Sequence, residues 1–460
     1  MDGAGLHFAI ADIVMGEAML LAACGFLLLG LGDLLVDVIW IVRTATRRLR
    51  SHEYASADTL ATPDRPGTLA IFVPAWDEAN VIEDMLRTTL ARLAHSDYRI
   101  YVGTYPNDPA TIAAVKRIAD PRIRLVVGHA PGPTTKADCL NRLWDALHAD
   151  EDGDGRPVKA VVLHDAEDLV HPAELKVFDT LIERFDLVQL PVLPIVDRNT
   201  SVISATYADE FAEAHGKELV VREAIGASIP SAGVGCAFSR EALARMAARN
   251  GGQPFAADSL TEDYELGLRL HASGGRAAFV RLPVTRNGRV IATREYFPGT
   301  VDDAVSQKAR WMVGIALSGW DRLGWSGGLA ERWMRLRDRQ SLLAAMLLFA
   351  AYLTFLLWVV LQGRLLLTGA PAPPISQPLF TVLQINLGLL AWRLSMRFGF
   401  VTHAYGWRQG LASIPRVVVG NAIAMLAARK ALFRYLATRR TGTMRWDKTK
   451  HSFPTAIPAE

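Results

Sequence analysis

Cysteine is scarce in this chain of 460 residues, which contains only Cys24, Cys139 and Cys236. These residues lie far apart and form no Cys-x-x-Cys pair, which argues against a disulfide framework or a zinc knuckle. A large charge of one sign is also lacking, because 50 Lys and Arg nearly balance 47 Asp and Glu, leaving a formal charge of +3. This mild balance gives no indication of a nucleic-acid partner.

Two loop motifs that bind nucleotides or calcium are present only in part. The segment SAGVGCAF, residues 231–238, contains neither Gly-x-Gly-x-x-Gly nor a Walker lysine, which excludes a Rossmann dinucleotide fingerprint. The segment DEDGDG, residues 150–155, matches the start of a calcium loop, but the twelfth position is Val161 instead of Glu. We therefore expect residues 150–155 to form a solvated surface loop.

Long hydrophobic runs are abundant, and half of the residues are hydrophobic. Residues 18–42 form one such run, and residues 341–362 contain 22 residues without a charge. A third run covers residues 376–394, and each of the three has the length of a membrane span. The run at 417–428 is apolar for only about a dozen positions, which favours an interfacial or re-entrant helix over a span.

Basic clusters lie beside these runs at residues 43–50, 332–339 and 393–408. By the positive-inside rule all three clusters face the cytoplasm, which places the N-terminus outside. We expect three regions: a transmembrane helix with its basic flank (1–50), a cytoplasmic catalytic domain (51–340), and a C-terminal region (341–460). The last region would contain two transmembrane helices, the interfacial helix and a cytoplasmic tail.

Two acids, Asp33 and Asp37, lie within the first run and four residues apart, so they share one face of a helix. Carboxylates at this depth usually face protein or a water-filled path instead of lipid. They would either bind Arg or Lys near the inner interface or line a path for a polymer.

Strand-like and helical segments alternate over residues 69–191, which predicts an α/β domain with a mostly parallel, doubly wound sheet. Polar residues follow three of the expected strands where these strands end: Trp76, Asp77 and Glu78; Asn107 and Asp108; Asp165, Glu167 and Asp168. Taken singly, Asp77 could cap a helix and Asp108 could lie in a proline-flanked turn. Together they predict one ligand site, because ligands bind such sheets at the carboxyl ends of strands.

Carboxylates without a Cys/His cluster are typical of a site for a hard cation, Mg²⁺ or Mn²⁺. Such a cation, held by few carboxylates, usually shares its coordination with a phosphate-bearing substrate. The acids of HDAED, residues 164–168, therefore suggest a diphosphate ligand.

Two further motifs follow the sheet region. In TED, residues 261–263, Thr261 could cap a helix whose first turn contains Glu262 and Asp263, or a carboxylate could take a proton from an acceptor hydroxyl. In QKARW, residues 307–311, Gln307, Arg310 and Trp311 share one helical face. The guanidinium could neutralise a diphosphate, and the indole could stack on a sugar.

The segments VPAWDE, TTKADCLN, DAED, TED and QKARW, in this order between hydrophobic runs, resemble the processive, membrane-embedded glycosyltransferases of family 2. Cellulose, chitin and hyaluronan synthases belong to this group. Longer runs, such as HDAEDLVHPAELKVF, SLTEDYELGLRL and WDKTKHSFP, are similar to a bacterial inner-membrane branch that is associated with phage adsorption.

The resemblance implies a GT-A fold, a UDP-sugar donor, a divalent cation and inversion at the anomeric carbon. The residues that it implies are grouped by role: Pro74, Asp77, Glu78 and Asp108 near the donor nucleoside; Lys136 and Asp165 at its diphosphate; Asp165 with Glu167 or Asp168 as metal ligands; Asp263, with Glu262 beside it, as the base; Arg310 at the leaving diphosphate; Gln307 and Trp311 at the acceptor.

The implied function is synthesis and export of a cell-envelope polysaccharide from an N-acetylhexosamine donor, in the bacterial inner membrane. A partner in the periplasm or outer membrane would assist export. The alternatives are transfer of a single sugar to a lipid carrier and a non-catalytic membrane scaffold for phage adsorption or export.

Overall fold

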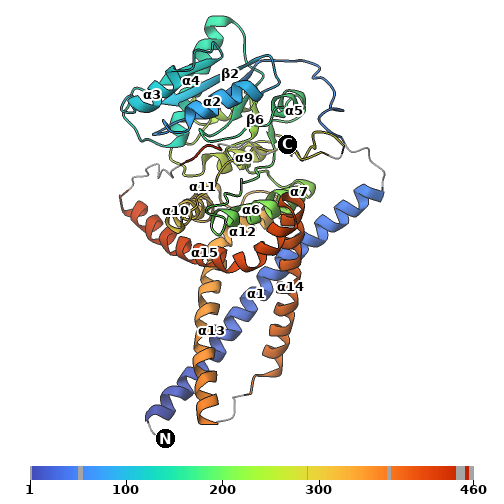
Figure 1. The fold of residues 1–460 in the computed structure, drawn as a ribbon, viewed down its shortest axis with the longest axis vertical. Helices are drawn as coiled ribbons and strands as arrows, with labels where there is room; N and C mark the ends of the chain where they lie inside the picture. Colours follow the sequence, from blue (N-terminus) through green and yellow to red (C-terminus); the bar gives the residue numbers. More distant parts are fainter. Residues whose placement is uncertain (1–2, 50–54, 287, 370–373, 442–450, 455–460) are drawn as a thin grey trace.

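The computed structural model describes residues 3–49, 55–286, 288–369, 374–441 and 451–454. Part of the WDKTKHSFP motif and most of the expected cytoplasmic tail therefore lie outside the described residues. A sheet domain lies at one end of the molecule and long helices extend from it to the other end (Figure 1).

The sheet has seven strands in the order β3-β2-β1-β4-β6-β5-β7. Their bounds are β1 Leu69–Pro74, β2 Tyr98–Thr104, β3 Ile123–Val127, β4 Ala160–Leu163, β5 Leu187–Gln189, β6 Cys236–Ser239 and β7 Ala277–Phe279. Only β6 runs antiparallel to its neighbours, β4 and β5. The prediction of an α/β domain with a mostly parallel sheet is confirmed.

Strand β1 lies between β2 and β4 and is buried along its whole length. Ile71 and Val73 join the core on one face of the sheet, whereas Ala70 and Phe72 join the core on the other. Both faces are apolar because helices cover both, as in other parallel sheets. Pro74 pairs with Gly103 at the strand end, where its missing N–H costs least.

The helices of this domain are α2 Ile82–Arg92, α3 Pro109–Lys116, α4 Lys136–Asp154, α5 Glu174–Leu181, α8 Arg240–Arg249 and α9 Glu262–Ala272. The surface loop expected at residues 150–155 is wrong, because α4 continues through Asp154 and Gly155 ends it with φ +64°. Within this turn Glu151 is buried and forms an ion pair with Arg240 at 2.8 Å. This pair stabilises the last turn of α4 against the sheet domain.

A layer of shorter helices lies between the sheet domain and the long helices (Figure 1). It consists of α6 Ser204–Glu213, the π-helix η1 Ala214–Glu218, α7 Leu219–Ala224, α10 Val301–Trp311, the π-helix η2 Met312–Ser318, α11 Gly319–Leu323 and α12 Leu329–Arg339. α10 and η2 pack against the last long helix, and α6 packs against the last two.

The long helices are α1 Gly3–Leu49, α13 Ser341–Thr368, α14 Gln377–Tyr405 and α15 Trp407–Thr441. All four are long and apolar enough to span a membrane by length and composition. α13 and α14 pack along α1, whereas α15 runs across the end of this bundle beneath the sheet domain (Figure 1). A helix that lies across the bundle in this way agrees with the interfacial helix predicted at 417–428, although α15 is longer than the predicted run. Membrane position and orientation stay predictions.

Asp33 and Asp37 of α1 are both ion-paired. Asp33 contacts Arg337 at 2.9 Å and also Arg393, and Asp37 contacts Lys217 at 2.6 Å. The ion-pair alternative is therefore confirmed for both carboxylates. Because these pairs join α1 to η1, α12 and α14, they fix the first long helix to the layer above it.

Candidate active site

A cavity of about 710 Å³ lies where the carboxyl ends of the strands face the layer of shorter helices. Of the predicted site residues, it is lined by Pro74, Glu78, Lys136, Asp165, Glu167, Glu262, Asp263, Gln307, Arg310 and Trp311. The other three, Asp77, Asp108 and Asp168, do not line it. The ends of β1 and β4 thus line one cavity, as the strand-end pattern predicted, whereas Asn107 and Asp108 at the end of β2 do not line it. Segments more than 200 residues later in the sequence complete the lining.

Lys136 is the first residue of α4, whose N-terminus is capped by the Thr135 hydroxyl accepting from the N–H of Asp138. Its Nζ lies 2.6 Å from Oδ1 of Asp165. Burial would lower the pKa of Lys136, but the carboxylates of Asp165, Glu262 and Asp263 outweigh burial and raise it. Lys136 is therefore a permanent cation, suited to bind a diphosphate.

Glu78, Glu167 and His451 lie together, with one ligand atom of each within 4.8 Å of the others. Nδ1 of His451 lies 2.9 Å from Oε1 of Glu78 and 3.2 Å from Oε2 of Glu167. Burial raises the pKa of Glu167 to about 8, although His451 opposes this shift. The carboxylate oxygens of Glu78 and Glu167 are donors that a divalent cation such as Mg²⁺ or Mn²⁺ prefers.

His451 is a site residue that sequence reasoning missed. It follows the last long helix and contacts a residue 373 positions earlier in the chain. Burial would lower the pKa of His451, but Glu167 and Glu78 outweigh burial and raise it to about 9. The only signal in the sequence was the run WDKTKHSFP, which carried the resemblance without an assigned role.

Asp168 points away from the cavity into the core. Its Oδ2 lies 2.7 Å from Nδ1 of His164 and accepts from the N–H of Asp165 at 3.1 Å. His164 also lies 2.8 Å from Glu174. Burial would lower the pKa of His164, but Glu174 and Asp168 raise it to about 10, so the ring is an imidazolium that donates to both acids. This position favours Glu167 over Asp168 as the second acid that faces a ligand.

Asp108 joins the first two strand ends. Its Oδ2 accepts from the N–H of Asp77 at 2.6 Å, and its Oδ1 caps α3 by accepting from the N–H of Thr111 at 3.2 Å. Asp77 is exposed and has φ +54°, an unusual backbone conformation for an L-residue. The capping alternative for Asp77 is wrong, because α2 begins after Val81 without a side-chain cap. Donor binding by Asp77 and Asp108 stays a prediction.

Glu262 and Asp263 open α9, and both carboxylates line the cavity. Thr261 occupies the N-cap position of α9, as the capping alternative predicted, but its side chain makes no cap hydrogen bond. Burial and the charge of Asp263 raise the pKa of Glu262 to about 7. Burial also raises the pKa of Asp263, although Lys136 opposes this shift. Raised pKa values favour proton uptake, which a general base requires.

Gly233 leaves room for the Asp263 side chain because it has no Cβ. A Cβ at this position would lie 2.3 Å from Oδ2 of Asp263, and Gly233 has φ +75°. Both the backbone conformation and the close approach therefore require glycine. The glycines of SAGVGCAF do allow the backbone to approach the site closely.

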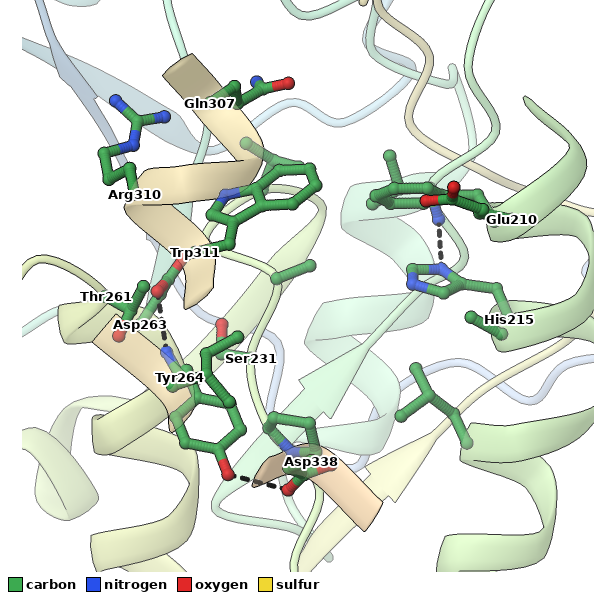
Figure 2. Close-up of a pocket in the computed structure, with 18 of the residues that line it drawn as sticks. Glu210, His215, Ser231, Thr261, Asp263, Tyr264, Gln307, Arg310, Trp311 and Asp338 are labelled. Atoms are coloured by element: carbon green, nitrogen blue, oxygen red, sulfur yellow. Dashed lines mark hydrogen bonds between the residues drawn. The ribbon is translucent and has the colours of Figure 1, made fainter. Parts of the chain in front are cut away.

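Gln307, Arg310 and Trp311 lie on one side of the cavity, on α10 and close to Asp263 in the view of Figure 2. The Trp311 ring packs beside Tyr207 and Phe297, with centroids 6.0 and 6.4 Å away. This aromatic wall is suited to the apolar face of a sugar ring.

The cavity continues from the strand ends to the long helices. This part is lined by Leu29, Asp33 and Val36 of α1, Ser341 and Ala344 of α13, and Arg393 of α14. Tyr264, a lining residue, donates to Asp338 at 2.7 Å (Figure 2). Arg222, which also lines the cavity, donates to Asp338 at 2.8 Å. A ligand that extends from the strand ends toward the long helices would contact these residues next.

Comparison with known proteins places the chain among sugar-transferring enzymes. The sequence model described as "Glycosyltransferase like family 2" matches residues 66–314. Bacteriophage adsorption protein B of Escherichia coli (strain K12) is 40% identical over 455 residues, which cover 92% of this chain and 60% of that protein. Bacteriophage N4 adsorption protein B of Escherichia coli O157:H7 gives the same values. The chain thus spans about 60% of the length of these curated relatives.

Among solved structures, the mannosyltransferase PcManGT from Pyrobaculum calidifontis, in complex with GDP-Man and Mn²⁺, is similar with a TM-score of 0.49 and 16% identity. The likeness covers 92% of this chain and 99% of that one.

Proposed function

The chain belongs to the family 2 glycosyltransferases, and we propose that it transfers an N-acetylhexosamine from a UDP-sugar onto a growing glycan at the bacterial inner membrane. The observation that carries this proposal is one cavity that joins strand-end acids, the TED and QKARW side chains and three long helices. Such a cavity provides for donor binding, sugar transfer and passage of product in one place.

The donor would bind at the strand ends. The uridine would lie near Pro74, Asp77 and Asp108, and Lys136 would bind the diphosphate through its permanent charge. Asp165, Glu167 and Glu78 present oxygen donors for a divalent cation, Mg²⁺ or Mn²⁺, which when bound supplies positive charge to the leaving diphosphate. The Arg310 guanidinium would add to this charge from α10.

Asp263 would act as the base. Its carboxylate would take the proton of an acceptor hydroxyl while the oxygen of that hydroxyl bonds to the anomeric carbon and the bond to UDP breaks. A single displacement of this kind inverts the anomeric carbon. Glu262 would stay beside Asp263 and raise its affinity for the proton, because the negative charges of two neighbouring buried carboxylates repel each other.

The acceptor would occupy the side of the cavity formed by Gln307 and Trp311. From there the product would pass toward α1, α13 and α14, which line the far end. A periplasmic or outer-membrane partner would receive the exported polysaccharide.

A second candidate, transfer of a single sugar to a lipid carrier, is favoured by the same opening of the cavity toward α1 and α13. Product length separates the two candidates, because a lipid-linked monosaccharide and a polymer differ in mass and in mobility on a gel.

The test is a donor screen with the purified full chain, Mg²⁺ or Mn²⁺ and a panel of UDP-sugars. UDP release measures transfer, and mass spectrometry identifies the product. Release with a UDP-N-acetylhexosamine and a polymeric product support the proposal. A non-catalytic scaffold predicts no release, and predicts that phage sensitivity survives the simultaneous replacement of Asp165, Glu167 and Asp168.

A further inference from the structure

His215 is a cavity residue that the proposed mechanism does not use. It lies in the π-helix η1, is 7% exposed and lines the cavity together with Val192. π-helical turns are rare and occur frequently at functional sites. Figure 2 shows the His215 ring on the opposite side of the view from Trp311 and Asp263.

The hydrogen bond of His215 defines its tautomer. Nδ1 lies 2.8 Å from the backbone nitrogen of Val192, which carries a hydrogen and can only donate. Nδ1 must therefore accept, and in a neutral imidazole the proton then sits on Nε2. Burial, with the charge of Arg281, lowers the pKa of His215 to about 3, so the ring stays neutral at physiological pH.

Nε2–H is consequently a donor with a fixed direction. Among the described residues no oxygen or nitrogen accepts a hydrogen bond from it. The ring is held in place by Phe211 and Phe279, with centroids 5.0 and 5.6 Å away. A donor that is held rigidly inside a cavity selects ligands with an oxygen at one position, because a buried donor without a partner is costly.

The position of His215 indicates which ligand it meets. Lys217 and Glu218, in the same π-helix, contact Asp37 of α1 and Arg337 of α12. His215 therefore lies between the long helices and the ends of β5 and β7, where Val192 and Phe279 contact it. Phe211 packs against both His215 and Trp311, with centroids 5.0 and 6.4 Å away, which joins His215 to the Trp311 side of the cavity. A sugar on this side would be part of the acceptor.

We propose that His215 is an acceptor-binding residue that donates a hydrogen bond from Nε2 to a hydroxyl or N-acetyl oxygen of the acceptor glycan. This inference rests on the proposed function and names a specificity determinant within the same cavity. The neutral ring holds the acceptor in position and transfers no proton.

The test compares two substitutions, each of which keeps the hydrogen-bonding function of only one ring nitrogen. His215→Asn keeps an oxygen that accepts from Val192 but removes the cavity donor, whereas His215→Gln keeps a donor near the position of Nε2. His171→Asn is the matched control, because His171 is also 7% exposed and its Nδ1 also accepts a backbone N–H, from Ala173 at 3.1 Å. His171 does not line the cavity.

Each full-chain variant is assayed with the donor from the screen and, as acceptor, a size-fractionated oligosaccharide from the product of the parent enzyme. His215→Asn should raise the KM for this acceptor about 5- to 10-fold, the effect of one lost hydrogen bond. The KM for the donor and the release of UDP without acceptor should stay unchanged. His215→Gln and His171→Asn should have the acceptor KM of the parent. His215→Asn should unfold at the parent temperature, whereas His215→Gln should unfold at a lower temperature, because the buried N–H of Val192 loses its acceptor.

An acceptor KM of His215→Asn equal to that of the parent would overturn the inference, as would an equal rise for His215→Gln. A parent that releases no UDP with any donor would contradict the proposed function and this inference together. An active parent with an unaffected His215→Asn variant would contradict the inference alone.

Discussion

Neighbouring acids of one short turn have different surroundings, and this difference decides which of them can meet a ligand. Glu167 faces the cavity beside Glu78 and His451, whereas Asp168 is buried against His164. The sequence DAED alone could not separate the two, because both are carboxylates near a strand end. The deciding contact comes from His164, a buried imidazolium that needs an acid on the core side.

Replacing each acid by its amide should therefore give different results. Glu167→Gln should abolish UDP release at little cost in stability, because it removes an oxygen ligand for the cation while the partly exposed His451 keeps Glu78 as a partner at 2.9 Å. Asp168→Asn should lower the free energy of unfolding by about 3–5 kcal/mol, because it leaves the His164 charge with one partner fewer. Thermal unfolding and UDP release on both variants check this, and a stable, inactive Asp168→Asn variant would contradict it.

Asp263 and Glu262 can be separated in the same way. Asp263→Asn should lower the rate of sugar transfer by about 10²–10⁴-fold, the usual contribution of a general base. Glu262→Gln should have a smaller effect, because Glu262 acts only through its neighbour. UDP release measures both variants, and an Asp263→Asn variant that releases UDP at the parent rate would exclude Asp263 as the base.

At the scale of elements, local sequence patterns predicted most of the architecture. The apolar run of β1, ended by Pro74, and the polar residues that follow each strand gave the sheet and one site at its edge. The loop expected at 150–155 was wrong because Glu151, an acid in a polar segment, is buried through its pair with Arg240. The alternative that Thr261 caps a helix gave the right N-cap position but not the cap hydrogen bond, which its side chain does not make. Such tertiary contacts leave no local pattern.

The loop between α7 and β6 supports the site through Gly233. Gly233→Ala should lower sugar transfer by about 100-fold, because the added methyl group would displace the Asp263 carboxylate, and small misplacements cost that much. Gly226→Ala is the matched control, since Gly226 has φ +72° but nothing within 4 Å of an added Cβ. Both should lose about 1–2 kcal/mol of stability to the backbone conformation, but only Gly233→Ala should lose activity. Equal activities of the Gly233→Ala and Gly226→Ala variants would contradict the close contact between residue 233 and Asp263.

At the scale of the whole molecule, distant parts of the chain meet only in the folded state. His451 contacts Glu78 across 373 positions, and α1 contacts α12 and α14 through Asp33. Hydrophobic length predicted the long helices, and Asp33 within the first run was a signal that this helix could face a path instead of lipid; Asp33 does line the cavity. Contacts of this separation depend on packing and not on local periodicity.

The far end of the cavity offers a test of product passage. Ala344→Trp would place a large ring among the α13 residues that line it, whereas Ala351→Trp lies on the same helix outside the lining. The yield of long product should fall about tenfold for Ala344→Trp, since 1.4 kcal/mol of lost glycan binding corresponds to that factor. Gel sizing of the product measures this, and equal product lengths for the two variants would contradict passage along α13.

The family match ends at residue 314, but the walls of the cavity do not. Leu29, Asp33 and Val36 before the match, and Met334, Ala344, Arg393 and His451 after it, line the same space. The long helices α1, α13 and α14 are therefore as much a part of the cavity wall as the sheet domain. Helices that are usually regarded as membrane anchors would then tolerate as few sequence changes at their lining positions as the site residues do. A mutation that only disturbs the insertion of α1 should impair sugar transfer while leaving every residue of the matched region intact.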